Sequence, residues 1–95
     1  MTKKLKNPKG KLTGPASAII LIEVLPKEHL NVLQVVKADL EKIEGIKDIH
    51  GIFGTWDLSA ILEEASFEDL KTKVIDEIRA VPGVGKTQTL LRFPL

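Results

Sequence analysis

Two stretches of the chain combine residue types that could bind a small molecule. The first is Gly54-Thr55-Trp56-Asp57, which places the only Trp of the 95 residues beside a carboxylate. The second is AVPGVGKT, residues 80–87, which differs from the phosphate-binding pattern G-x-x-x-x-G-K-[ST] by an Ala at its first position. Each stretch has to be weighed against the structural elements that would hold it.

The 80–87 stretch has the wrong structural context for a phosphate. A phosphate-binding loop follows a strand and opens a helix, whose first backbone N–H groups hold the anion. Here a helical apolar pattern precedes the stretch and a β-rich segment follows it. We therefore reject nucleotide binding at residues 80–87.

The residues needed for catalysis or metal binding are scarce. The chain has no Cys, which excludes disulfides and thiolate metal sites and suits a reducing, cytoplasmic compartment. The two His residues, His29 and His50, do not form a spaced ligand set, and no Ser has a base nearby in the pattern. No apolar run reaches the ~18 residues that a membrane span needs. We expect no enzyme activity, no cofactor, no metal and no membrane contact.

The Gly54–Asp57 stretch predicts a turn between two strands. Gly54 can adopt the positive φ that such a turn requires. Asp57 could serve only as a turn residue and Trp56 only as a cover for the end of the core. Alternatively, both side chains could contact a ligand, and residue types alone leave the two readings open.

The chain repeats its own pattern at an offset of 38 residues. Apolar residues match apolar residues along the two halves, and Gly45-Ile46 aligns with Gly83-Val84. Each half is predicted as strand, helix, strand. The expected strands are 18–25, 46–53, 57–64 and 84–93, with helices over 32–43 and 67–81.

This order predicts an α+β fold of the ferredoxin-like type. Right-handed crossovers in a βαββαβ chain give a four-stranded antiparallel sheet with both helices on one face. The strand AIILIEVL carries apolar residues on both of its faces, so the uncovered sheet face would expose them. An exposed apolar sheet face predicts a partner, and the simplest is a second copy, sheet against sheet.

Charge is unevenly distributed along the chain, whose net charge is +1. Residues 1–15 hold five Lys and no acid, whereas residues 16–95 hold nine basic and thirteen acidic side chains. We predict a flexible basic leader over 1–15 and one folded domain over 16–95. The leader could touch DNA non-specifically, but the acidic body is not expected to read a DNA sequence.

The order of these motifs resembles the effector-binding domain of the Lrp/AsnC transcription regulators, also called the regulation-of-amino-acid-metabolism domain. The matching pieces are AIILIEV, GTWDLSAIL and VPGVGKTQT, within residues 16–93. Trp56 departs from the Tyr or Phe that is commoner at that position. The chain resembles a stand-alone form of the domain, without the helix-turn-helix domain of full regulators.

The resemblance implies sheet-to-sheet dimers that assemble into rings, often octamers, with an amino acid bound between dimers. Carried over, the site residues are Gly54, Thr55, Trp56, Asp57, Thr87 and Thr89. A carboxylate and backbone N–H groups suit a zwitterion, which needs an acceptor for its ammonium and donors for its carboxylate. The chain would then tune transcription by joining a full-length Lrp/AsnC regulator, with no sequence-specific DNA binding of its own. Two alternatives remain: a ring-forming protein without a ligand, and a small dimeric α/β-barrel enzyme.

Overall fold

The structure is a computed structural model that describes residues 15–25 and 30–94. The described elements are β1 (Ala16–Val24), α1 (Leu30–Leu40), β2 (Ile46–Gly51), β3 (Leu58–Glu64), α2 (Phe67–Lys73), the π-helical η2 (Val74–Ile78) and β4 (Val84–Arg92). Their order confirms the predicted βαββαβ fold. The predicted basic leader, residues 1–15, falls outside the described residues except for Pro15.

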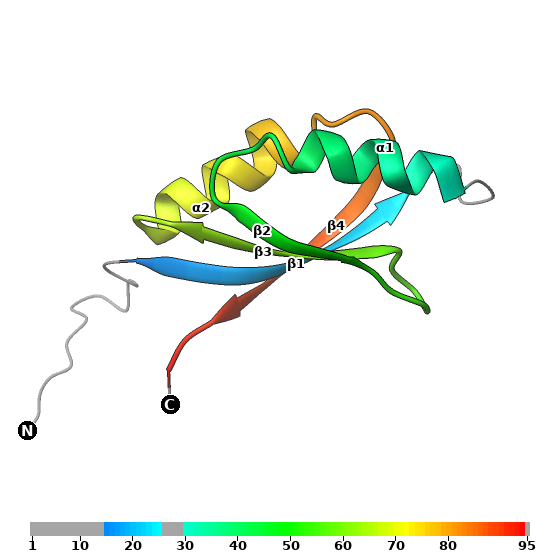
Figure 1. Cartoon of the computed structure of the whole chain (residues 1–95). Coiled ribbons are helices and arrows are strands. Elements are labelled where there is room, and N and C mark those ends of the chain that lie inside the picture. The colour runs from blue at the N-terminus through cyan, green and yellow to red at the C-terminus, as the bar shows by residue number, and fades with distance from the viewer. Residues whose placement is uncertain (1–14, 26–29, 95) are drawn as a thin grey trace, which may run out of the picture.

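The four strands form one antiparallel sheet in the order β2-β3-β1-β4. Both helices lie on the same face of this sheet, and the opposite face carries no covering element within the described residues (Figure 1). The strands β2 and β4 are therefore the edges, and β1 lies inside the sheet. This arrangement matches the expectation of a sheet covered on one side.

Strand β1 shows how the sequence creates the two faces. Alternate side chains point to opposite faces of a strand. Ala18, Ile20, Ile22 and Val24 have no solvent exposure and form the centre of the core beneath the helices. The residues between them are only half-buried, because they lie on the uncovered face. Within the described residues, no polar or charged residue is buried in the core.

The two halves of the chain end their helices in the same way. Gly45 and Gly83, which align in the sequence repeat, both have a φ of +96°. An L residue rarely adopts this conformation, so glycine lets the chain leave each helix and enter the next strand. The repeat in the sequence is thus also a repeat in backbone geometry.

The second helix begins as predicted but does not continue as a regular α-helix. The hydroxyl of Ser66 accepts a hydrogen bond from the backbone N–H of Asp69 at 3.1 Å, which caps the first turn. After Lys73 the chain widens into the π-helical segment η2, where the N–H of Arg79 bonds to the carbonyl of Val74 at 3.0 Å. The apolar periodicity predicted one helix over 67–81 and could not reveal this widening.

Candidate functional site

The hairpin between β2 and β3 is fastened to β1 by Asp57. Its carboxylate Oδ2 accepts a hydrogen bond from the backbone N–H of Val24 at 2.8 Å. Its backbone N–H donates to the carbonyl of Ile22 at 2.9 Å, and its own carbonyl accepts from Ile52 at 3.0 Å. Asp57 therefore has a structural role at the end of β1, and its second carboxylate oxygen is the atom that would be left for a ligand.

The rest of the hairpin is open to solvent. Gly54 has a φ of +124°, as expected for the turn, and no atom lies within 4 Å of the Cβ position that another residue would place there. Thr55 is exposed and Trp56 is half-buried. Phe53, just before the turn, is fully exposed at 106%. The Phe53 ring is therefore open to contact with another molecule.

The two predicted Thr residues lie on the helix side of the edge strand β4. Thr87 pairs with Ile22 across the β1–β4 ladder, and Thr89 pairs with Ile20. Thr87 is half-buried, whereas Thr89 is exposed and lines a groove between α2 and β4. The hairpin residues 54–57 do not line that groove.

The groove between α2 and β4 contains Thr89 but none of the other five predicted site residues. Thr87 and Asp57 approach the same residue, Ile22, but from opposite sides of β1. Strands lie ~4.8 Å apart, so two strand spacings separate them by ~10 Å. A ligand that contacts both clusters would therefore have to span ~10 Å.

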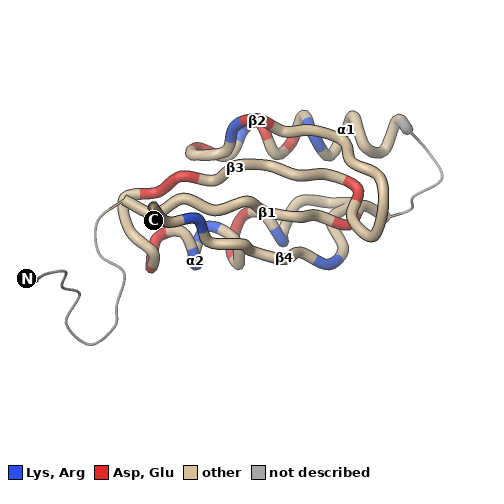
Figure 2. Tube along the Cα trace, turned by 90° about the horizontal axis from the view of Figure 1, so that it is seen from below, with Lys and Arg blue, Asp and Glu red and all other residues tan. Residues whose placement is uncertain are grey.

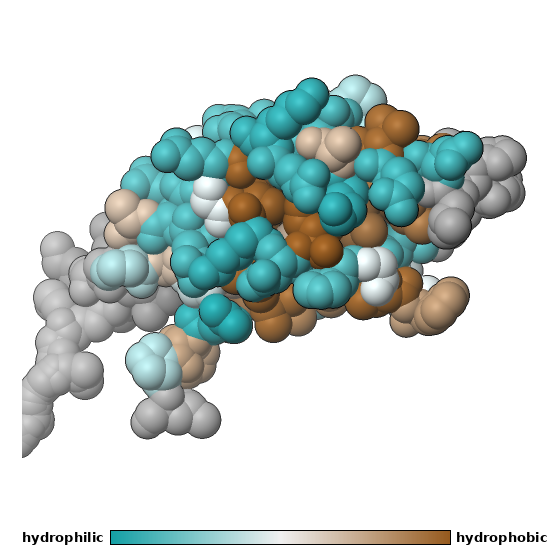
Figure 3. Space-filling model, viewed as in Figure 1, coloured by the Kyte–Doolittle hydropathy of each residue, from teal (hydrophilic) through white to brown (hydrophobic). Residues whose placement is uncertain are grey.

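The open sheet face provides a surface on which copies could meet. Ile61, Ile19 and Leu90 pair directly across β3, β1 and β4 and form an apolar row. Leu21 extends this row toward the C-terminal end of β1, and Leu90 is 39% exposed. Figure 2, which views this face, shows charged residues near the strand ends and an uncharged middle. In the side view of Figure 3, hydrophobic residues also reach the lower margin, where the sheet lies.

Charged groups near the end of β3 are paired with one another. Lys73 lies 3.7 Å from Glu64 and 3.5 Å from Glu77, and the side chains of Lys73 and Glu64 are each only 16% exposed. Burial acts to lower the pKa of Lys73, but the negative charges of Glu64, Glu77 and Glu44 outweigh it and raise the pKa above its ordinary value of 10.5. This cluster stabilises the fold and leaves Lys73 charged.

Two features of possible functional importance were not found from the sequence. One is the groove between α2 and β4, which depends on where the helix sits across the sheet. The other is Glu23, whose Oε1 accepts a hydrogen bond from the backbone N–H of Lys86 at 3.1 Å, beside an irregularity in the β1–β4 register. The only signal for Glu23 was an acid inside an otherwise apolar strand.

The described residues contain no group of three or more His, Cys, Asp or Glu side chains placed to hold a metal ion. Ser17 accepts hydrogen bonds from the guanidinium of Arg92 at 2.9 and 3.2 Å, and His50 contacts the carbonyl of Asp48 at 3.1 Å. None of these contacts pairs a hydroxyl with a base. No helix within the described ranges is long and apolar enough to cross a membrane.

Comparison with known proteins places this architecture in one family. Residues 17–93 match the model of the Lrp/AsnC ligand binding domain, and the chain belongs to that family. An HTH-type transcriptional regulator of Pyrococcus abyssi is 36% identical over 83 residues, and one of Pyrococcus horikoshii is 32% identical over 83 residues. Each match covers 87% of this chain but 55% of the relative, so the chain spans about half the length of these regulators.

Solved structures agree on the fold. AsnC of E. coli matches with a TM-score of 0.73 and 16% identity, over 84% of this chain and 52% of that one. A transcriptional regulator of Neisseria meningitidis, solved as a complex with L-methionine, matches with a TM-score of 0.72 and 14% identity, over 99% of this chain and 59% of that one. At these identities the likeness establishes the fold alone.

Proposed function

We propose that the chain is an effector-binding and oligomerisation module that acts in amino-acid-linked control of transcription. The membership of the Lrp/AsnC ligand-binding family supports the class of function. The observation that carries the proposal is the uncovered apolar row Ile61–Ile19–Leu90 on a sheet covered on its other side only. Burying apolar surface at ~25 cal/mol per Å² makes pairing of two such faces favourable.

The effector site forms between copies and takes an amino acid. Its residues are Gly54, Thr55, Trp56, Asp57, Thr87 and Thr89. The separation of Asp57 and Thr87 on the two sides of β1 supports an intermolecular site. The exposed hairpin supports it too, because Gly54 and Thr55 are free to approach a ligand or a neighbouring copy.

The module regulates through other proteins, either within rings of its own kind, such as octamers, or with a full-length Lrp/AsnC regulator in the cytoplasm. The relatives are HTH-type regulators about twice as long as the matched segment, which supports this kind of partner. We propose that the domain does not read a DNA sequence by itself. It is not an enzyme: its described core is wholly apolar, and a catalytic cavity would need polar groups there.

One observation favours a second candidate, a ring-forming protein without an effector. Asp57, the only carboxylate of the proposed site, already accepts a hydrogen bond from Val24. A panel of the twenty amino acids in a thermal-shift assay separates the two candidates. An effector at one hundred times its Kd would add ~2.7 kcal/mol of stability. A melting temperature that no amino acid changes would rule out sensing while leaving assembly intact.

A further inference from the structure

The edge strand β4 extends beyond the helix that covers its neighbours. The helix α2 packs over β3 and β1, so the helix side of β4 is left largely uncovered. Thr89, on that side, is exposed, and Leu91 is only half-buried. Between this strand and the helix lies a groove with a volume of about 280 Å³.

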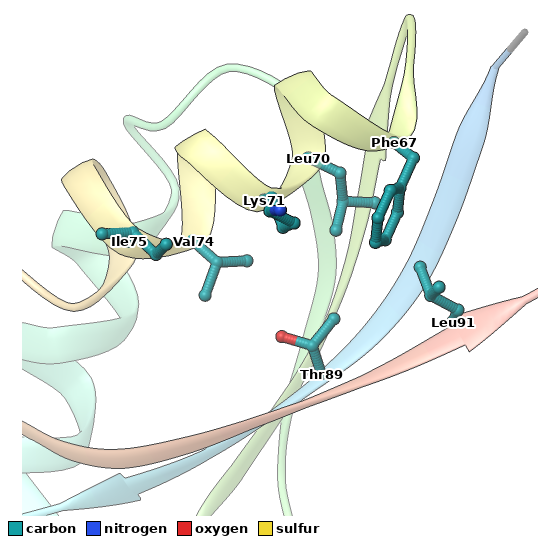
Figure 4. Close-up of a pocket in the computed structure, with 7 residues that line it drawn as sticks. All are labelled: Phe67, Leu70, Lys71, Val74, Ile75, Thr89 and Leu91. Atoms are coloured by element: carbon teal, nitrogen blue, oxygen red, sulfur yellow. The ribbon is translucent and has the colours of Figure 1, made fainter. Parts of the chain in front are cut away.

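The walls of the groove are apolar and come from both elements, as Figure 4 shows. The helical side supplies Phe67, Leu70, Val74 and Ile75, and the strand supplies Leu91. Leu70 and Val74 belong to the core, whereas Ile75 is 55% exposed at the groove. An apolar lining of this size suits a compact hydrocarbon group of on the order of ten non-hydrogen atoms.

The π-helical segment forms part of this wall. Val74 and Ile75 are its first residues, and the wide turn is closed by the bond from Arg79 to Val74. Such single-turn π segments cost regular hydrogen bonding and occur frequently at functional sites. The widening here occurs in the part of the helix that faces the groove.

Only two polar side chains line the groove, and neither is an acid. Lys71 stands beside Phe67, with its Nζ 5.8 Å from the centre of the ring, and its side chain is 54% exposed. Glu68 is 4.0 Å from that Nζ but does not line the groove. Thr89 supplies a hydroxyl from the strand (Figure 4). The groove thus offers a cation and a hydroxyl, with no carboxylate on its lining for a ligand ammonium.

We propose that this groove binds a small monocarboxylate with a branched or aromatic apolar tail and no amino group. The tail fills the space between α2 and β4, the carboxylate pairs with Lys71, and the Thr89 hydroxyl donates a hydrogen bond. An amino acid is disfavoured, because its ammonium would lie near the Lys71 cation with no carboxylate on the lining to pair with it. This site shares Thr89 with the proposed effector site, but its other six lining residues lie outside that site.

The test is a titration of the full chain followed by two-dimensional NMR of backbone amides. The probes are 4-methylpentanoate, L-leucine with the same carbon skeleton, and 3-methylbutylamine as a cation with a similar tail. We expect saturable shifts at Lys71, Ile75 and Thr89 with the carboxylate, at least tenfold weaker binding of leucine there, and none of the amine. Shifts at Gly54 and Thr55 report the hairpin site separately, so each proposal can fail alone.

Two variants and a matched control identify the binding groups. Lys71→Gln should weaken binding of 4-methylpentanoate about tenfold, the usual effect of losing one charge-assisted hydrogen bond. Ile75→Glu, at an exposed position, should abolish it by placing a negative charge at the groove. Lys42→Gln removes the same charge from an exposed side chain that does not line the groove, and it should change nothing. Absent shifts in the wild type, or equal affinity in Lys71→Gln and Lys42→Gln, would overturn the proposal.

Discussion

The carboxylate of Asp57 and the backbone N–H of Val24 are 33 positions apart in sequence and joined by a hydrogen bond of 2.8 Å. This bond fixes the β2–β3 hairpin against the end of β1. The sequence left open whether Asp57 is a turn residue or a ligand contact. The hydrogen bond makes Asp57 a structural residue that also sets the position of the proposed ligand-binding turn. Its two roles can be separated by substitution.

Replacing Asp57 with Ala should lower the free energy of unfolding by about 1–3 kcal/mol. The N–H of Val24, a residue with no solvent exposure, would lose its acceptor, and an unsatisfied buried donor carries a cost of this size. Asp57→Asn keeps an oxygen that can accept the bond and should lose less stability, while any amino-acid binding weakens. Urea denaturation of the two variants measures the difference, and equal stability of Asp57→Ala and the wild type would contradict the structural role.

Phe53 should act in assembly and not in folding. Its ring is fully exposed, so Phe53→Ser should change the free energy of unfolding by no more than about 0.5 kcal/mol. Sedimentation velocity should show loss of species larger than the dimer in this variant. Val35→Ser, at a 59% exposed position on α1 outside the hairpin, serves as the control. If Phe53→Ser assembled like the control, the hairpin would have no part in the larger species.

Two glycines with positive φ should respond differently to alanine. A Cβ at Gly45 would collide with the side chain of Glu64 and would lie 2.6 Å from the carbonyl oxygen of Glu63. A Cβ at Gly54 would meet no atom within 4 Å. Gly54→Ala should therefore carry only the conformational cost of roughly 1–2 kcal/mol, and Gly45→Ala clearly more. The melting temperatures of the two variants measure the difference. A lower melting temperature for Gly54→Ala than for Gly45→Ala would contradict the close approach of Gly45 to Glu63 and Glu64.

Lys73 should make stability depend on pH in the alkaline range. Its pKa is higher in the folded chain than its ordinary value of 10.5, because nearby Glu64, Glu77 and Glu44 favour the charged form despite burial. A raised pKa contributes stability that is fully present below the unfolded pKa and is lost as pH rises through the folded pKa. The stability of the wild type should thus fall more steeply above about pH 10 than that of Lys73→Met.

The control for this pH dependence is Lys42→Met, which removes a lysine whose side chain is 79% exposed. Urea midpoints measured from neutral to alkaline pH give the slope for each variant. Lys42→Met should keep the slope of the wild type. Parallel slopes in the wild type and Lys73→Met would mean that the Glu cluster does not act on Lys73.

The fold was largely readable from the sequence because its signals are local and repeated. These signals are the nearly continuous apolar run in β1, the apolar stripe Leu70–Val74–Ile78 and the glycines after each helix. The strand boundaries differ by one or two residues, and β2 ends at Gly51, two residues before the predicted end. The spacing of apolar residues did not indicate the π-helical turn, because Val74 and Ile78 are buried in either form of helix.

The candidate site was predicted less completely, because contacts between distant segments decide it. The bond from Val24 to Asp57 and the one from Lys86 to Glu23 each join residues far apart in sequence. Thr87 and Thr89 lie on one face of β4, but their burial depends on how far α2 reaches across the sheet. The α2–β4 groove depends on the position of α2 over the sheet, which no sequence motif indicates.

The most direct test of the account is the molar mass of the chain in solution, measured by light scattering after size exclusion at micromolar concentration. The account predicts a wild-type mass of at least two chains, because the row Ile61–Ile19–Leu90 is buried against a second copy. Leu90→Lys should shift it toward one chain by placing a charge in that contact, whereas Thr72→Lys, on the exposed side of α2, should not. A wild-type mass of a single chain under these conditions would contradict the central claim.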